Sequence, residues 1–156
     1  MRALLQRVSR AAVRVDRELV ASIGPGLVVL VGIGHGDDPA TADALARRIS
    51  DLRILPDANG RTNRSVLEAG GEILVVSQFT LYADTSRGRR PGFTDAAPPE
   101  VARALYERFA GEFRNLGVGR VETGRFAAEM AVEIVNDGPF TIWLDTADRR
   151  PAPERA

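Results

Sequence analysis

Apolar residues recur along the chain with two different spacings, so the sequence predicts both strands and helices. Four short apolar or alternating segments near the start are typical of strands and cover residues 3–8, 12–16, 18–23 and 27–33. With turns at Arg17 and at 24–26, they predict an antiparallel meander. The segment 72–79 contains a continuous apolar run, which predicts a central strand buried on both faces. Further strands are expected at residues 120–123, 131–135 and 140–144.

Two segments show the spacing of amphipathic helices, with apolar residues three or four positions apart. The first covers residues 39–53 and follows Asp37 or Asp38, either of which can cap it. The second covers residues 98–117, beginning with two prolines and stopping at a glycine. The predicted fold class is therefore α/β, with a mainly antiparallel sheet and two packed helices.

The composition is that of one soluble globular domain, with 156 residues of which 44% are hydrophobic and 27% charged. We place a single domain at residues 1–146 and expect the polar segment 147–156 to be a disordered C-terminal tail. Residues 1–8 do not have the pattern of a signal peptide, and no apolar run is long enough to span a bilayer. A cytoplasmic protein without membrane contact is expected.

Charge and residue usage exclude several kinds of chemistry. Twenty-one basic residues balance 21 acidic ones, so an RNA partner would have to meet a local basic patch. All basic residues are Arg and Cys is absent, which excludes lysine Schiff bases, thiol catalysis and thiolate metal sites. The single histidine, His35, cannot build a multi-histidine metal site, and the glycines around it lack the spacing of a dinucleotide-binding loop. We therefore expect an ordinary turn there, and neither a metal nor another cofactor.

The first candidate site is the polar segment at the end of the predicted central strand, Ser77, Gln78, Phe79 and Thr80. Ligands often bind where a buried strand ends, but hydroxyl groups at such places also serve to satisfy backbone groups. The Thr80 hydroxyl would need a neighbouring base to act as a nucleophile, and no His or Lys stands beside it. A binding role and a structural role both stay open, and Thr80 is a poor nucleophile in either case.

The second candidate is the segment 136–139, Asn-Asp-Gly-Pro, between two alternating apolar segments. Asn, Asp and Gly favour tight turns, so a hairpin is expected here. Pro139 after Gly138 gives the peptide bond between them access to the cis form, which would turn two carbonyl groups the same way. Such rigid carbonyls could hold an ammonium group without leaving room beside it, and so distinguish mirror-image substrates. The sequence spacing alone leaves the isomer open.

Two further groups of residues have both a structural and a functional interpretation. The long loop 83–99 carries three arginines within four positions, Arg87, Arg89 and Arg90. They suit a solvated surface, or a clamp for phosphate groups. Phe126 and Met130 suit a hydrophobic core, or the cover of a base or ribose beside a pocket.

Together these segments resemble the D-aminoacyl-tRNA deacylases, a family of chirality-checking hydrolases. The resemblance runs from residue 1 to about residue 145 and is carried by LLQRVSRA, GGEILVVSQFTLYAD, RGRRPGF, TGRFAAEM and NDGPFTIWL. SQFTL and NxGPxT at this separation form a specific signal. The chain departs from the family pattern at Phe140, where Val is common.

The resemblance implies a homodimer of small barrel-like α/β subunits with active sites at the subunit interface. A cis Gly-Pro dipeptide would enter the partner's pocket, hold the substrate ammonium group and clash with L side chains. The implied site residues are catalytic Ser77, Gln78, Phe79 and Thr80, substrate-binding Gly138, Pro139, Phe126, Met130 and Arg7, and the tRNA-phosphate contacts Arg87, Arg89 and Arg90.

The implied reaction is hydrolysis of the ester between a D-amino acid and tRNA, as a proofreading step of translation. Glycyl-tRNA is an implied second substrate, and the attacking group would be a water assisted by a tRNA ribose hydroxyl. The implied partners are tRNA and a second copy of the chain, with no DNA. Two alternatives stay open, an editing hydrolase for wrongly attached L-amino acids and a non-catalytic RNA-binding barrel.

Overall fold

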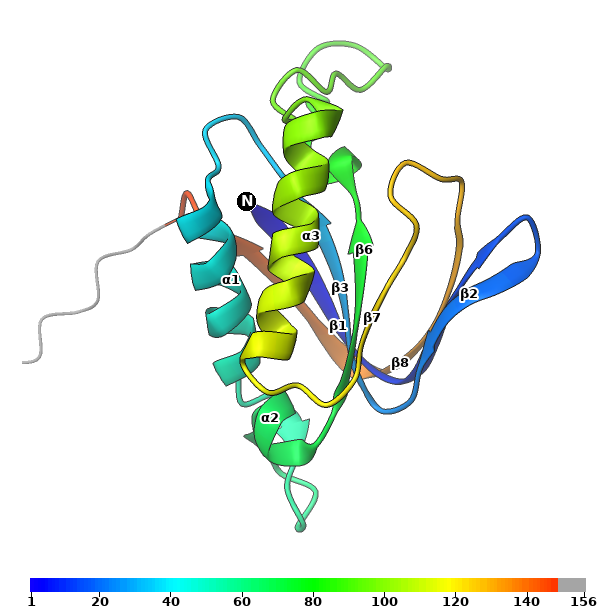
Figure 1. The fold of residues 1–156 in the computed structure, drawn as a ribbon, viewed down its shortest axis with the longest axis vertical. Helices are drawn as coiled ribbons and strands as arrows, with labels where there is room; N and C mark the ends of the chain where they lie inside the picture. Colours follow the sequence, from blue (N-terminus) through cyan, green and yellow to red (C-terminus); the bar gives the residue numbers. More distant parts are fainter. Residues whose placement is uncertain (149–156) are drawn as a thin grey trace, which may run out of the picture.

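A curled sheet with helices packed on one face makes up the computed structural model, which describes residues 1–148 (Figure 1). The strands pair in the order β2-β1-β3-β6-β7, and β8 also pairs with β1. Their bounds are β1 Arg2–Val15, β2 Glu18–Ile23, β3 Gly26–Gly32, β6 Glu72–Ser77, β7 Val121–Thr123 and β8 Ala131–Asp145. The helices are α1 Pro39–Asp51, α2 Val66–Ala69 and α3 Pro99–Asn115. Within the described residues, no helix is both long and apolar enough to cross a membrane.

β1 organises the sheet, because other strands pair along both of its edges. β8 runs antiparallel to nearly the whole of β1, while β3 and β2 follow one another along its other edge. The strands expected at 3–8 and 12–16 are therefore one strand, and the predicted meander is wrong. The turn at 24–26 bends the chain without reversing it, and there the amide of Gly24 donates to the Glu72 carboxylate at 2.7 Å.

Parallel pairing on the far side of β3 accounts for the continuous apolar run of β6. This strand lies between β3 and β7 and is parallel to both. Ile73 and Val75 face the helices, while Leu74 and Val76 face the interior of the curled sheet, and all four are almost fully buried. The predicted central strand is confirmed.

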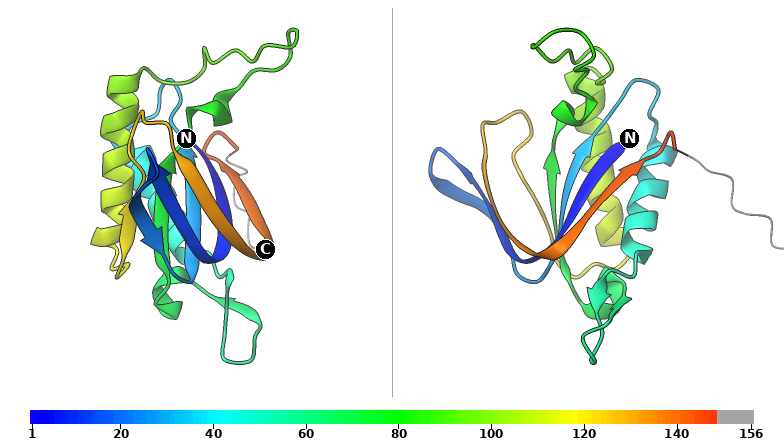
Figure 2. Two further views of the ribbon diagram at one scale, coloured as in Figure 1. Left: turned by 90° about the vertical axis from the view of Figure 1, so that its right-hand side faces the viewer. Right: turned by 180° about the vertical axis from the view of Figure 1, so that it is seen from behind.

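Two hydrophobic clusters hold the fold together, one on each face of the sheet. The larger one joins the sheet to α1 and α3 and includes Leu45, Ile49, Phe109 and Phe113. The smaller one includes Val8, Val13, Ile23 and Val28 and lies on the other face of the sheet. Figure 2 shows that the sheet curls on this side, away from the helices. The predicted barrel-like α/β fold with two packed helices is confirmed, with the short α2 in addition.

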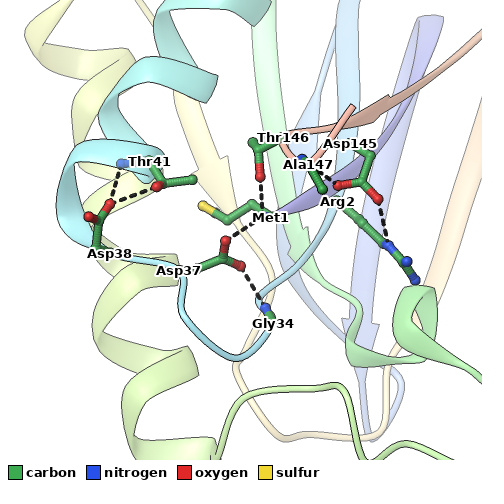
Figure 3. A network of polar contacts seen from close by, with 9 residues as sticks. All are labelled: Met1, Arg2, Gly34, Asp37, Asp38, Thr41, Asp145, Thr146 and Ala147. Atoms are coloured by element: carbon green, nitrogen blue, oxygen red, sulfur yellow. Dashed lines mark hydrogen bonds and ion pairs between the residues drawn. The ribbon is translucent and has the colours of Figure 1, made fainter. Parts of the chain in front are cut away.

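The start of α1 separates the roles of the two aspartates that could have capped it. Asp38 is the cap, because its Oδ1 accepts the amide hydrogen of Thr41 at 2.7 Å. Asp37 instead accepts the amide hydrogen of Gly34 at 2.7 Å and forms an ion pair with the Met1 ammonium group at 2.6 Å (Figure 3). It therefore fixes the turn that follows β3.

The short elements between α1 and β6 have no hydrophobic period in the sequence and are therefore not predicted. The hairpin of β4 Leu55–Pro56 and β5 Thr62–Arg64 precedes the four-residue α2. A capping box opens α2, in which Ser65 Oγ accepts from the Glu68 amide at 3.2 Å and the Glu68 carboxylate accepts from the Ser65 amide at 2.7 Å. That motif is visible in the sequence, but one turn of helix is too short to show a hydrophobic period.

The end of β8 is tied to the start of β1. Arg2 donates to the Asp145 carboxylate at 2.9 Å, and the same carboxylate accepts the amide hydrogen of Ala147 at 2.9 Å (Figure 3). Residues 147–148, the first of the expected disordered tail, thus belong to a turn. Residues 149–156 of that tail lie outside the described residues.

Candidate active site

A cavity of about 820 Å³ opens where β3 and β6 end and α3 begins. Ligands in α/β sheets commonly bind beyond the carboxyl ends of parallel strands, and β3 and β6 form such a pair. Most of the lining is apolar, which suits an organic ligand. The lining comes from residues 33, 35, 76–79, 93–94, 96–99, 102, 126–130 and 132.

The first candidate segment lies at this cavity. Ser77, Gln78 and Phe79 belong to the lining, and Thr80 follows directly outside it. The strand expected over 72–79 ends at Ser77, because the chain then turns into the 3₁₀ helix η1, Phe79–Tyr82. This turn carries the polar segment away from the sheet and leaves it at the cavity.

The surroundings of Thr80 do not activate its hydroxyl. The side-chain amide of Gln78 donates a hydrogen bond to the Thr80 oxygen, and an amide cannot take up the hydroxyl proton. The first amides of a helix have no acceptor within it, so those of Phe79 and Thr80 are available as donors. Within residues 1–148, no three metal-binding side chains gather into one group. The site therefore offers hydrogen-bond donors and shape more than reactive side chains.

Phe126 and Met130 form another wall of the cavity and also pack against the two hydrophobic clusters, so their contact with a base or ribose stays a prediction. The Tyr106 hydroxyl braces this wall by donating to the carbonyl oxygen of Val75 at 3.0 Å and lying 3.4 Å from that of Gly124. The Phe126 ring packs against Tyr106 with 5.7 Å between the ring centroids. Burial raises the pKa of Tyr106 to about 12, so its hydroxyl remains a donor at neutral pH.

The three loop arginines stand beside the cavity rather than in it. Asp84 and Gly92 exchange backbone hydrogen bonds of 2.8 and 2.9 Å, which close the residues between them into a hairpin. This arginine hairpin, residues 84–92, belongs to the loop at the top of Figure 1. Its tip carries the exposed Arg87, Arg89 and Arg90, whose side chains form no ion pair with the rest of residues 1–148.

The hairpin turn predicted at 136–139 is wrong, because β8 continues through this segment as one strand with a bulge. The flanking residues of β8 stay paired with β1, so four residues, 137–140, stand opposite the single Arg7. Local turn propensity therefore produces a projection and not a reversal of the chain. The peptide bond between Gly138 and Pro139 is cis. We call these two residues the Gly-Pro tip.

Side chains on both strands hold this bulge. Arg7 Nε donates to the carbonyl oxygen of Asp137 and pairs with its carboxylate, both at 3.0 Å, while Nη1 donates to the carbonyl oxygen of Ile54 at 2.9 Å. The guanidinium group also lies over the Phe140 ring at 4.6 Å. Asn136 Nδ2 closes the neck of the bulge by donating to the carbonyl oxygen of Arg7 at 2.8 Å. Arg7 thus supports the Gly-Pro tip and does not line the cavity of its own chain, and its expected contact with substrate stays a prediction.

The Gly-Pro tip and the cavity of one chain lie at opposite ends of the sheet. Arg7 of β1 pairs with Leu27 of β3, and Leu27 pairs with Ile73 of β6. Ser77 lies four residues further along β6. That offset is about 13 Å along the strands, and the three strand spacings from β8 to β6 add about 14 Å across them. One chain therefore does not bring its own tip to its own Ser77.

Three residues near these sites were not expected to take part. His35 lines the cavity, and its Nε2 lies 2.9 Å from the carbonyl oxygen of Thr94. Phe93 also lines the cavity, although the sequence presents this residue only as part of the RGRRPGF segment. Asn136 was treated as a turn former. Nothing in the sequence around Asn136 indicates that its side chain closes a bulge.

Fold and site together define a small α/β protein whose candidate site offers backbone groups and apolar walls. The chain belongs to the family described as D-Tyr-tRNA(Tyr) deacylase, whose family model matches residues 4–145. It is 62% identical over 147 residues to a protein of Roseiflexus sp. (strain RS-1) named D-aminoacyl-tRNA deacylase, covering 94% of each chain. A protein of the same name from Thermomicrobium roseum is 60% identical over 150 residues, covering 96% of this chain and 97% of that one.

Two solved structures share the fold. One, described as "c-Myc DNA Unwinding Element Binding Protein", matches with a TM-score of 0.88 and 39% identity, over 97% of this chain and all of that one. The other, described as "Structural Analysis of a probable eukaryotic D-amino acid tRNA deacylase", matches with a TM-score of 0.77 over 92% of this chain and 97% of that one. At 19% identity, this second match shows the fold alone.

Proposed function

We propose that this protein hydrolyses the ester bond between a D-amino acid and tRNA, releasing free tRNA and the D-amino acid. The family and the names of the relatives support this proposal. The observation that carries it is the cavity, where Ser77 and Gln78 meet the wall of Phe126 and Met130 beside the arginine hairpin. Apolar walls suit the terminal nucleoside with its amino acid, and arginines suit the phosphates behind it.

The chemistry that we propose needs no strong nucleophile, because an aminoacyl ester is already activated. Positioning of the ester and stabilisation of the oxyanion then supply much of the acceleration. The backbone amides of Phe79 and Thr80 are the donors that we assign to the oxyanion. A water attacks the ester carbon with the help of a ribose hydroxyl of the tRNA, and the leaving ribose oxygen takes up a proton. The Thr80 hydroxyl takes no covalent part.

In our proposal the Gly-Pro tip acts in the cavity of a second copy of the chain. The distance from each tip to its own Ser77 supports this arrangement, as does the rigid mounting of the bulge by Arg7 and Asn136. β8 pairs with β1 alone among the described strands, and it exposes Val135 and Trp143 by 40% and 46%. An edge strand with exposed apolar residues suits a contact between subunits.

Selection by the tip also determines the range of substrates. The tip carbonyls would receive the substrate ammonium group, and an L side chain would collide with the tip. Glycyl-tRNA has no side chain to collide and is therefore a second expected substrate. Removal of D-amino acids from tRNA is a proofreading step of translation, so we expect the protein to act in the cytoplasm.

Hydrolysis of D-tyrosyl-tRNA and L-tyrosyl-tRNA by the purified protein tests the proposal. We expect the D substrate to react faster by about 100-fold or more, since discrimination by a collision or an unpaired polar group reaches this size. Equal rates would contradict selection by handedness. A preference for the L substrate would favour an editing hydrolase for misattached L-amino acids.

A second candidate function is binding of nucleic acid without turnover. The description of the solved structure at 39% identity, a DNA unwinding element binding protein, favours it. This function predicts salt-dependent binding of single-stranded DNA or RNA, because phosphate contacts release counterions, and no hydrolysis. Measuring binding and hydrolysis on one preparation separates the two functions.

A further inference from the structure

Two aromatic rings form an exposed pair at the mouth of the cavity. Phe79 and Phe93 meet edge to face with 5.0 Å between their centroids, and their side chains are 55% and 37% exposed. Both residues also line the cavity. Single exposed apolar residues are common on protein surfaces, but two large rings in contact at a cavity mouth leave a π-face free for a ligand.

The backbone holds both rings in place. Strand β6 ends at Ser77, and Phe79, two residues later, is the first residue of η1. Phe93 follows Gly92, which closes the arginine hairpin. Thr94 follows Phe93 in the chain, and its carbonyl oxygen lies 2.9 Å from the imidazole Nε2 of His35. A planar ligand would therefore meet a surface that is already formed.

The aromatic pair connects two chemically different regions. On its inner side lies the apolar cavity, which suits a nucleoside and its amino acid. On its outer side lies the arginine hairpin, whose three exposed cations match the phosphates of an RNA strand. Because Phe93 lines the cavity and directly follows the hairpin in the chain, the aromatic pair adjoins both regions.

We infer that Phe79 and Phe93 are a stacking site for the unpaired nucleotide that precedes the terminal adenosine of the tRNA. Bases stack on aromatic side chains with little dependence on sequence, and neighbouring arginines track the backbone. This inference rests on the proposed function. It extends the proposed ester-cleaving cavity to the exposed rings at its edge and assigns Phe93 to this extension.

The test compares D-tyrosyl-tRNA with D-tyrosyl-adenosine, which lacks this nucleotide and the rest of the tRNA. For Phe93→Ala we expect KM for D-tyrosyl-tRNA to rise about ten-fold, the effect of one lost stack, with kcat little changed. Hydrolysis of D-tyrosyl-adenosine, which lacks this nucleotide, should lose much less. An equal loss on both substrates, or no loss on either, would overturn the inference.

Three further variants separate stacking from other effects. Phe93→Tyr keeps a flat ring and should retain the wild-type KM, whereas Phe93→Leu keeps apolar surface without a π-face and should behave like Phe93→Ala. Leu19→Ala truncates a residue that is 53% exposed and lies in β2, outside the cavity lining, and should change neither substrate. A changed oligomeric state of Phe93→Ala in light scattering would assign the pair to a subunit contact and overturn the inference.

A binding measurement keeps the inference testable if the proposed function fails. Should the wild type cleave neither substrate, anisotropy of a labelled single-stranded RNA ending in CCA reports the same contact. Phe93→Ala should then bind about ten-fold more weakly than the wild type and Leu19→Ala. Equal affinities of the three proteins would overturn the stacking site independently of any turnover.

Discussion

The two ends of the sheet carry different halves of the proposed site. At one end, beyond β3 and β6, the chain forms a roomy apolar cavity with few reactive groups. At the other end, on β8, it forms a small projection in which Arg7, Asn136 and Asp137 bond to one another and to the backbone. The cavity offers room for a ligand, whereas the projection is held in place by hydrogen bonds and an ion pair.

In our proposal, this contrast accounts for selectivity without a reactive nucleophile. The cavity alone would admit either hand of an amino acid, because apolar walls discriminate weakly between isosteric groups. In our proposal, selectivity arises where the tip of one copy enters the cavity of the other, so disturbing the tip should cost more than disturbing the polar groups of the cavity.

The largest expected effect comes from one methyl group on the tip. In Gly138→Ala the new Cβ would collide with Asn136 Oδ1, which has to move and loosen the neck of the bulge. We expect kcat/KM for D-tyrosyl-tRNA to fall about 100-fold, equivalent to about 2.7 kcal/mol. Gly111→Ala is the matched control, because a Cβ at Gly111 in α3 meets nothing within 4 Å. Equal activity of the two variants would remove the tip from the mechanism.

A smaller loss is expected when the mounting of the tip is removed. Arg7→Met keeps most of the packing of the stem but leaves Asp137 and the carbonyl of Ile54 without their donor. We expect about a ten-fold fall in kcat/KM for the D substrate together with a lower ratio of D to L hydrolysis. Arg14→Met is the control, since Arg14 also joins β1 to β8, through an exposed ion pair with Glu133. A fall in rate with an unchanged D to L ratio would contradict a positioning role for Arg7.

At high pH the buried tyrosines should weaken the fold. Burial raises the pKa of Tyr106 to about 12, and burial with the nearby Asp37 and Asp145 carboxylates raises the pKa of Tyr82 still further. The folded state thus favours the neutral phenols. Their contribution to the free energy of unfolding is complete below the ordinary tyrosine pKa of about 10, and it is lost as the pH rises through about 12.

Denaturant unfolding between pH 9 and about 12 checks this expectation, with tyrosinate absorbance recorded in parallel. The chain contains two tyrosines and neither Lys nor Cys, so few other side chains titrate in this range. We expect the free energy of unfolding to fall with pH, and less steeply in Tyr106→Phe. Tyrosinate absorbance that reaches half of its full value near pH 10 in the folded protein would contradict the raised pKa values.

The smallest effect is expected at the hydroxyl that looks most like a nucleophile. Thr80→Ala removes the oxygen that accepts from Gln78 but leaves the backbone amide that we assign to the oxyanion. The rate should stay within about three-fold of the wild type, whereas loss of a true nucleophile costs several orders of magnitude. Single-turnover hydrolysis of D-tyrosyl-tRNA decides between the two.

Local signals in the sequence predicted the elements that depend on local interactions. The apolar run of β6 indicated that this strand is buried. Asp38, one of the two predicted candidates, caps α1. Gly117, where the second helix was expected to stop, adopts a φ of 97° beyond the end of α3. Where distant strands decide the structure, the same signals failed. The turn formers at 136–139 and the polar break between 3–8 and 12–16 both lie in continuous strands, because β1 and β8 pair with each other.

The candidate site shows the same division. The end of β6 was recognisable as a place where polar residues follow a buried strand, and the structure adds the wall of Phe126 and Met130 to it. The sequence could not reveal that Arg7 supports the tip instead of lining the cavity, since this depends on the register of β1 and β8. The aromatic partner of Phe79, Phe93, depends likewise on how the arginine hairpin folds back.

Mixing two inactive variants tests most directly whether the tip of one copy completes the cavity of another. Gly138→Trp should destroy the tip, and Ala128→Trp should fill the cavity. If the site forms between subunits, dimers reassembled from equal amounts should regain about a quarter of wild-type D-tyrosyl-tRNA hydrolysis, because half are mixed and each of these has one intact site. No recovery in a mixture shown to contain mixed dimers, or a monomeric wild type, would contradict the account.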